Sequence, residues 1–306
     1  MHNKTLSYIV FSVILIMASF LVGCSGGSSA NHTDEQRETL HDVPVPKASG
    51  SITYGGGSVS VDASNTSEGY IMVKYAGGAD KAKLQLTEPD GTVYSYTLKG
   101  SNYETFPLSG GNGSYNMQVL EHAYGDMYAL VFSQGIYAEL DNEFGPFLYP
   151  NQYVWFTPDS DAVQYGIKIS DKSSNDLDYV EQIYDYVIQN ISYDEETAAN
   201  ITADYIPDID KTMESGKGIC FDYASLMAGL LRSQGIPTKL VVGYSGSAYH
   251  AWISVYTDET GWVDNIIEFD GKNWSLMDPT LAACNDSSSV KEYIGDGSNY
   301  TEKFSY

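Results

Sequence analysis

The hydrophobic pattern of the chain changes its period about halfway along the sequence. Between residues 50 and 140, apolar and polar residues alternate in short runs such as Ser58–Val61 and Lys83–Leu86. Beyond residue 141, apolar residues recur at three- and four-residue steps, first within Leu177–Ile191. A two-residue period places side chains on one face of a strand, and a period near 3.6 places them on one face of a helix. We therefore expect an α+β protein with a β-rich first half.

The first half is expected to be a β-sandwich of the immunoglobulin-like kind over residues 50–140. About seven short strands at this spacing, separated by turn residues, are typical of such a domain. Pro89, Asp90 and Gly91 form a turn signal between two of these strands. No catalytic cluster stands out in this segment.

The second half, residues 141–306, combines helices with strands. The Leu177–Ile191 pattern predicts a helix with Asn175 or Asp176 near its N-cap. Residues 194–218 are polar and interrupted by Pro207, which favours a loop. A second helix is expected over residues 220–234, with Gly235 at its end, because Pro237 prevents its continuation. Three strands are expected to follow, at residues 239–244, 250–256 and 274–277.

The first residues have the features of a targeting signal. Lys4 precedes the apolar run Leu6–Phe20, which is too short for a confident membrane-spanning helix and fits a signal peptide. The run ends in Leu21–Cys24, which resembles the lipobox of bacterial lipoproteins. The alternative is an ordinary signal peptide or an N-terminal anchor in which Cys24 is incidental. The resemblance implies removal of residues 1–23 and lipidation of Cys24. We then expect residues 24–49 to be a flexible tether, and the protein to be anchored on the outer face of a bacterial membrane.

Composition argues against several classes of partner. The 16 Lys and Arg residues against 40 Asp and Glu residues give a formal net charge of −24. The only arginines are Arg37 and Arg232, too few for the basic patch that nucleic-acid binding requires. Three cysteines are too few for a disulfide framework. We therefore expect no nucleic-acid partner.

One group of residues has the chemistry of a nucleophilic site. Cys220 opens the second predicted helix, where unpaired N–H groups and the positive helix end favour a thiolate. A helix end contributes only about 1 kcal/mol, so an activated thiol also needs a cation, and an imidazolium is the usual one. His250 is the candidate, and Asp278 can orient its ring. Each residue alone is more often structural, but the joint pattern favours a catalytic triad.

Five blocks of the second half resemble the core of the transglutaminase-like superfamily. They are Gly216–Ala228, Leu230–Pro237, Val241–Tyr244, His250–Trp252 and Trp274–Thr280. Two earlier segments, Phe147–Pro150 and Ile191–Asp194, resemble a variant found in Gram-positive surface proteins. The resemblance implies a papain-like fold, with Cys220 as the nucleophile, His250 as general base and acid, and Asp278 as the residue that orients His250. The backbone N–H of Cys220 is one expected oxyanion donor, and a second stays open among upstream Trp, Tyr and Gln residues.

The triad leaves the reaction open, because related triads perform acyl transfer to amines, peptide hydrolysis and glycan removal from asparagine. We expect a membrane-anchored extracellular thiol enzyme that forms an acyl-enzyme at Cys220 from a protein or peptide amide and passes it to an amine or to water. Cell-wall peptides are included among its expected substrates. The alternative is a catalytically idle binding or scaffolding module of the cell surface.

No cofactor or metal ion is expected. The sequence has no EF-hand loop. Acidic residues that are expected to be solvated rather than metal ligands are Asp208 with Asp210, Asp258 with Glu259, and Glu121 with Asp126 beside His122. The remaining thiol, Cys284, is expected to be a small buried hydrophobe that forms no disulfide with Cys220.

Overall fold

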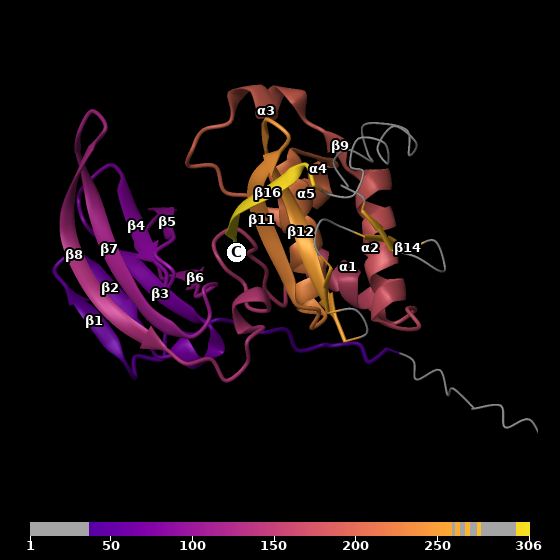
Figure 1. The fold of residues 1–306 in the computed structure, drawn as a ribbon, viewed down its shortest axis with the longest axis horizontal. Coiled ribbons are helices and arrows are strands. Elements are labelled where there is room, and N and C mark those ends of the chain that lie inside the picture. The colour runs from indigo at the N-terminus through magenta and orange to yellow at the C-terminus, as the bar shows by residue number, and fades with distance from the viewer. Residues whose placement is uncertain (1–36, 259–260, 264–266, 270–273, 277–297) are drawn as a thin grey trace, which may run out of the picture. The chain divides into compact units, whose positions relative to one another are not determined.

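The computed structural model describes residues 37–258, 261–263, 267–269, 274–276 and 298–306 (Figure 1). Cys24, Asp278, Cys284 and the predicted signal peptide lie outside these residues. Within the described part of the chain, helices and strands are both present, so the protein is of mixed α and β structure. No helix in that part combines the length and the apolar character needed to cross a bilayer.

Residues 53–138 form two four-stranded antiparallel sheets (Figure 1). The first has the order β1-β2-β3-β6, with β1 at Thr53–Gly56, β2 at Val59–Asp62, β3 at Tyr70–Tyr75 and β6 at Glu104–Pro107. The second has the order β5-β4-β7-β8, with β4 at Ala82–Thr87, β5 at Val93–Leu98, β7 at Gly113–Tyr124 and β8 at Met127–Ala138. A short 3-10 helix, η1, lies at Thr66–Glu68.

Alternation along the strands explains how these sheets pack. In β4, every second side chain is buried, as the two-residue period of the sequence predicts. The buried residues of both sheets contribute to one hydrophobic cluster. Tyr75 of β3 donates a hydrogen bond of 2.8 Å to the carboxylate of Glu121 of β7, which joins the two sheets. The predicted turn at Asp90 is confirmed, since β4 and β5 pair as an antiparallel hairpin around it.

Residues 37–40, within the part of the predicted flexible tether that the structure describes, make specific contacts with the second half. Arg37 forms an ion pair with Asp176, with 2.8 Å between Nε and Oδ1, and its Nη1 donates to Ser170 at 2.6 Å. The backbone N–H of Leu40 donates to the Gln234 side chain at 3.1 Å, and the same side chain donates back to the Leu40 carbonyl at 2.9 Å. These contacts depend on residues well over a hundred positions away, which a local pattern does not reveal.

The second half contains the helices and a further antiparallel sheet. The helices are η2 at Gly145–Phe147, α1 at Asp161–Ser170, α2 at Asp176–Asn190, α3 at Glu195–Asn200, α4 at Ile209–Ser215 and α5 at Cys220–Ser233. The sheet has the order β13-β12-β11-β16, with β11 at Thr238–Ser245, β12 at Ala248–Thr257, β13 at Gly261–Val263 and β16 at Tyr300–Ser305. The second half also has two separate two-stranded sheets. One pairs β9 at Ser192–Tyr193 with β10 at Lys217–Gly218, and the other pairs β14 at Ile267–Phe269 with β15 at Trp274–Leu276.

The prediction of a loop over residues 194–218 is wrong, because this stretch contains α3 and α4. Asp194 accepts a hydrogen bond of 2.9 Å from the backbone N–H of Thr197, and Asp208 accepts one of 3.1 Å from Lys211. Both aspartates are therefore helix N-caps. Pro207 lies just before the second cap, where a proline interrupts no helical hydrogen bond.

Helix α5 is surrounded by other elements rather than lying on the surface. It contacts β11 and β12 on one side and α1, α2 and α4 on the other (Figure 1). Every side chain from Asp222 to Ser233 is consequently buried. Arg232 is among them, and its guanidinium donates to the backbone carbonyls of Thr238, Tyr149 and Tyr306. The predicted helix end is confirmed, since Gly235 follows α5 with a φ of 79°, which favours glycine.

Candidate active site

The start of α5 fixes the position of the Cys220 thiol. Cys220 is the first residue of the helix, and Ile219 is an extended N-cap with φ −97° and ψ 176°. The preceding strand β10 pairs in parallel with β9 through Lys217 and Gly218, so the chain enters the helix from an ordered position. The thiol is free and half-buried. The sequence-based prediction that Cys220 opens a helix is therefore confirmed.

Asp222 stabilises this helix start from within. Its carboxylate accepts hydrogen bonds from the Ile219 backbone N–H at 2.9 Å and from the Tyr205 hydroxyl at 2.7 Å. Burial raises the pKa of the Asp222 carboxyl, and the two hydrogen bonds partly oppose that shift. A side-chain carbon added at Gly218 would lie 2.7 Å from Cβ of Asp222, so only glycine leaves room for this carboxylate.

His250 is held by the sheet that packs on α5. It lies on β12 opposite Gly243 of β11, and its ring stacks on buried Trp252 with 6.3 Å between the ring centroids. A Cβ at Gly243 would come within 2.0 Å of the carbonyl oxygen of Thr301, so glycine permits the close approach of β16. The predicted strand that begins near His250 is confirmed, and it is part of β12.

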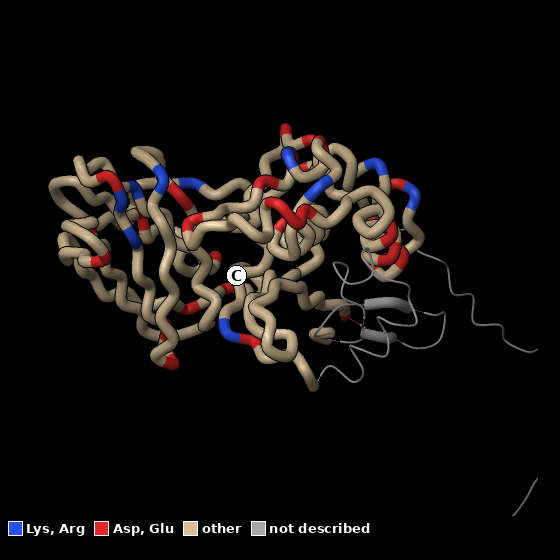
Figure 2. Tube along the Cα trace, turned by 90° about the horizontal axis from the view of Figure 1, so that it is seen from above, with Lys and Arg blue, Asp and Glu red and all other residues tan. Residues whose placement is uncertain are grey.

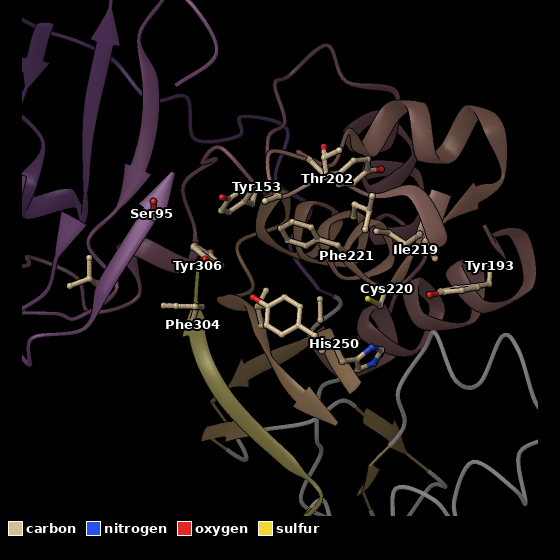
Figure 3. A pocket seen from close by; sticks show the side chains of 18 residues that line it. Ser95, Tyr153, Tyr193, Thr202, Ile219, Cys220, Phe221, His250, Phe304 and Tyr306 are labelled. Carbon is tan, nitrogen blue, oxygen red and sulfur yellow. The ribbon is translucent and has the colours of Figure 1, made fainter. Parts of the chain in front are cut away.

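Cys220 and His250 lie in the same cavity of about 540 Å³. Figure 3 shows both residues at one end of the cavity, with Ser95, Phe304 and Tyr306 at the other end. The thiol comes from a helix N-terminus and the imidazole from a neighbouring strand, as the sequence predicted. The third predicted residue, Asp278, lies outside the described residues, so its role stays a prediction.

The cavity lining is rich in aromatic and apolar side chains. None of the 18 residues shown in Figure 3 is a lysine, arginine, aspartate or glutamate. Burial raises the pKa of the phenols of Tyr153, Tyr205 and Tyr249, so these groups are neutral at physiological pH. By contrast, Asp and Glu positions occur along both halves of the described chain (Figure 2). Apart from Cys220 and His250, the cavity lining is thus uncharged, although the protein as a whole is acidic.

Sequence reasoning did not single out Tyr205 and Asp222. Asp222 occupies the third position of α5, where an acidic side chain commonly accepts the N-cap backbone N–H. That spacing is a signal that local reasoning could have used. The contact of Tyr205 with Asp222 joins two segments separated by α4, and no local pattern predicts it.

The other candidate clusters have structural partners. The two ring nitrogens of His122 lie 2.8 Å from Asp80 Oδ1 and 2.8 Å from the Gly125 carbonyl oxygen. Asp208 caps α4, and Asp210 accepts a hydrogen bond of 2.9 Å from the backbone N–H of Ala162. Among the residues that the structure describes, no group of His, Cys, Asp and Glu side chains is arranged to hold a metal ion.

Comparison with known proteins identifies the domain that carries this cavity's thiol and imidazole. Residues 163–265 match the family model of the transglutaminase-like superfamily. The uncharacterized protein YebA of Bacillus subtilis (strain 168) is 31% identical over 118 residues, covering 32% of this chain and 16% of that protein. A protein-glutamine gamma-glutamyltransferase of Pseudomonas aeruginosa is 32% identical over 68 residues, covering 18% of this chain and 10% of that enzyme.

Residues 163–265 are therefore a transglutaminase-like domain, and at the family level this match supports a thiol enzyme. The matched segments are a small part of both relatives. The structure of red sea bream transglutaminase gives a TM-score of 0.30 at 12% identity, covering 71% of this chain and 48% of that one. A TM-score this low carries no weight for the fold.

Proposed function

We propose that this protein is an extracellular, lipid-anchored thiol enzyme that forms an acyl-enzyme at Cys220. The observation that carries the proposal is that Cys220 and His250, both in the transglutaminase-like domain and 30 positions apart in sequence, line one cavity. The substrate is a protein or peptide amide, including amides of cell-wall peptides. The acceptor of the acyl group is a primary amine or water.

In this proposal His250 moves the protons. His250 accepts the thiol proton as the sulfur of Cys220 attacks the amide carbonyl carbon, and the backbone N–H of Cys220 donates to the developing oxyanion. The C–N bond then breaks, the leaving amine takes the proton from His250, and a thioester remains. An amine or water transfers a proton to His250 as it attacks the thioester, the C–S bond breaks, and the thiol is regenerated. Asp278 is proposed to orient the imidazole throughout.

Two structural features support the finer assignment of the fold. The strand orders β1-β2-β3-β6 and β5-β4-β7-β8 fit an immunoglobulin-like sandwich. In such a sandwich, the chain passes back and forth between two antiparallel sheets, as it does here. A nucleophile at the start of a helix, packed against an antiparallel sheet with the histidine, fits the papain-like arrangement. We propose boundaries at residues 50–140 and 141–306 for these two domains.

The proposed anchor is Cys24 on the outer face of a bacterial membrane. It is supported by the apolar run Leu6–Phe20 followed by Leu21–Cys24 in the sequence. Residues 24–36 would then separate the lipid from Arg37, which is bound to the second half. In this proposal, the anchor keeps the active site near the membrane surface and near cell-wall peptides.

The experiment is an incubation of the purified protein with casein, with and without added putrescine. Free ammonia with crosslinked casein or incorporated putrescine identifies acyl transfer, ammonia alone identifies deamidation, and new peptides identify proteolysis. A Cys220→Ala protein is the control, and its free energy of unfolding should fall by less than the roughly 2 kcal/mol of a core truncation. If Cys220→Ala protein shows the same turnover as the parent, the proposed mechanism is wrong.

A further inference from the structure

We infer that strands β5 and β16 form a specificity wall of the Cys220 cavity, which selects substrates with an uncharged apolar or aromatic side chain beside the reacting amide. This inference rests on the proposed function and adds the substrate class to it. It also assigns the β-rich first half a part in substrate recognition, because β5 belongs to that half. The wall consists of Val93 and Ser95 of β5, Phe304 of β16, and Tyr306, which directly follows β16, and all four line the cavity.

The wall is built from both halves of the chain. Ser305 of β16 donates its backbone N–H to the hydroxyl of Tyr94 of β5 at 3.1 Å. The Tyr94 ring also meets Phe304 and Tyr306 edge-on, with centroid distances of 5.1 Å and 5.3 Å. These contacts hold β5 beside the end of β16, where Val93 and Ser95 line the cavity together with Phe304 and Tyr306.

Aromatic packing continues from the wall toward the thiol. Tyr153 meets Tyr306 edge-on at 4.8 Å and Phe221 at 5.2 Å between ring centroids. Phe221 is the residue directly after Cys220 in α5. An uninterrupted aromatic surface therefore connects β16 with the residue next to the nucleophile, and Figure 3 shows this order from Tyr306 through Phe221 to Cys220.

The chemistry of the lining selects against ions. No lining residue is a lysine, arginine, aspartate or glutamate. A charged substrate side chain that moves from water to the wall, away from His250, would therefore meet no counter-ion. The burial that keeps Tyr153 and Tyr306 protonated leaves the wall neutral. A volume of about 540 Å³ accommodates a side chain together with neighbouring peptide, within the usual range of ligand pockets.

Three alkylating probes of equal reactivity and different charge test the inference on the full-length protein. They are N-benzyl, N-(2-carboxyethyl) and N-(2-trimethylammonioethyl) iodoacetamide, and the rate of modification at Cys220 is followed by peptide mass spectrometry. The rate at Cys220 for each probe is divided by the rate at which the same probe modifies free N-acetylcysteine. We expect the benzyl probe to react at least about tenfold faster than either charged probe, because only that probe fills the apolar cavity.

A pair of matched variants tests the role of β5. Val93 and Val131 are both exposed strand valines, 45% and 42% respectively, but only Val93 lines the cavity. Val93→Lys should lower the benzyl preference by about fivefold or more and favour the carboxyethyl probe, while Val131→Lys should leave all three rates unchanged. Ser95→Asp, at the same wall, should instead favour the trimethylammonioethyl probe.

The outcomes separate the inference from the proposed function. If Cys220 reacts readily with iodoacetamide but shows no preference among the three probes, the inference is wrong and the proposed function stands. If Val131→Lys acts like Val93→Lys, the inference is also wrong, because net charge alone explains the change. If Cys220 reacts with every probe no faster than N-acetylcysteine, the proposed function itself is overturned, and the inference with it.

Discussion

The carboxylate of Asp222 accepts a hydrogen bond of 2.9 Å from the backbone N–H of Ile219, the residue that directly precedes Cys220. Ile219 is the N-cap of α5, so this bond fixes the angle at which the chain enters the helix. Tyr205 holds the other carboxylate oxygen at 2.7 Å. The position of the nucleophile therefore depends on a side chain that itself stays out of the reaction.

We predict that Asp222→Ala lowers both stability and thiol reactivity. The change leaves the buried Ile219 N–H without its acceptor, which should cost roughly 1–3 kcal/mol of unfolding free energy. Alkylation of Cys220 should slow several-fold because the helix start becomes less ordered. Denaturant unfolding and iodoacetamide labelling measure the two effects. Tyr205→Phe, which removes only the hydroxyl donor, should have a smaller effect, and equal effects of the two variants would contradict this account.

Glu88 should make the stability of the protein fall as pH rises toward neutrality. Its side chain is 7% exposed, and burial raises its pKa from 4.5 to about 7, although it accepts a hydrogen bond from Gly110 at 2.9 Å. A raised carboxyl pKa stabilises the folded state below the unfolded pKa, and this contribution is lost as pH rises through the folded pKa.

Glu88→Gln, which keeps an acceptor for Gly110, should therefore be more stable than the parent by roughly 2–3 kcal/mol at about pH 8, with the difference disappearing near pH 4. Thermal unfolding across this pH range measures it. Asp126→Asn is the control, because it removes an exposed carboxyl of the same half that is not among the groups that shift the Glu88 pKa. A Glu88→Gln protein with the same pH profile as the parent would show that Glu88 does not ionise in this range.

Local periodicity explains what could be predicted from the sequence. The strand β4 and the helix α2 with its Asn175 cap follow their apolar patterns closely. The start of α5 at Cys220 was also predictable, because Gly218 precedes it and a long apolar pattern follows. In each of these cases the residues that determine the element lie within it or directly beside it.

The remaining elements depend on distant contacts. Strand β16 has exposed Glu302 and Lys303 at its centre and no alternation, and it is stabilised by pairing with β11. Helix α4 has only seven residues, too few to be stable alone, and it packs on α5. The cavity wall supplied by Val93 likewise depends on how separate segments meet, so the sequence could indicate the nucleophile but not its surroundings.

Replacement of Cys24 tests the proposed anchor. Cys24→Ala should leave the precursor unprocessed or release the protein from the membrane fraction, because the acceptor for the acyl chains is lost. Fractionation followed by intact-mass analysis measures this in the producing bacterium. A change at Cys284 in the same assay is the control. Unchanged processing and membrane association of the Cys24→Ala protein would rule out the anchor.

We predict that added reductant changes the activity of neither the parent nor the Cys284→Ser protein. The reason is that Cys220 is a free thiol and Cys284 is expected to be a buried hydrophobe. Turnover of both proteins is compared with and without dithiothreitol. A parent that gains activity with reductant, beside a Cys284→Ser protein that is fully active without it, would instead demonstrate a redox switch between the two thiols.

The most direct test of the central claim is the rate at which iodoacetamide modifies Cys220 at about pH 6, compared between the parent and His250→Gln. If the imidazole activates the thiol within the shared cavity, Cys220 of the parent should react at least about tenfold faster than N-acetylcysteine, and His250→Gln should remove this advantage. A Cys220 that reacts no faster than N-acetylcysteine, with no effect of His250→Gln, would contradict the account and favour a catalytically idle module.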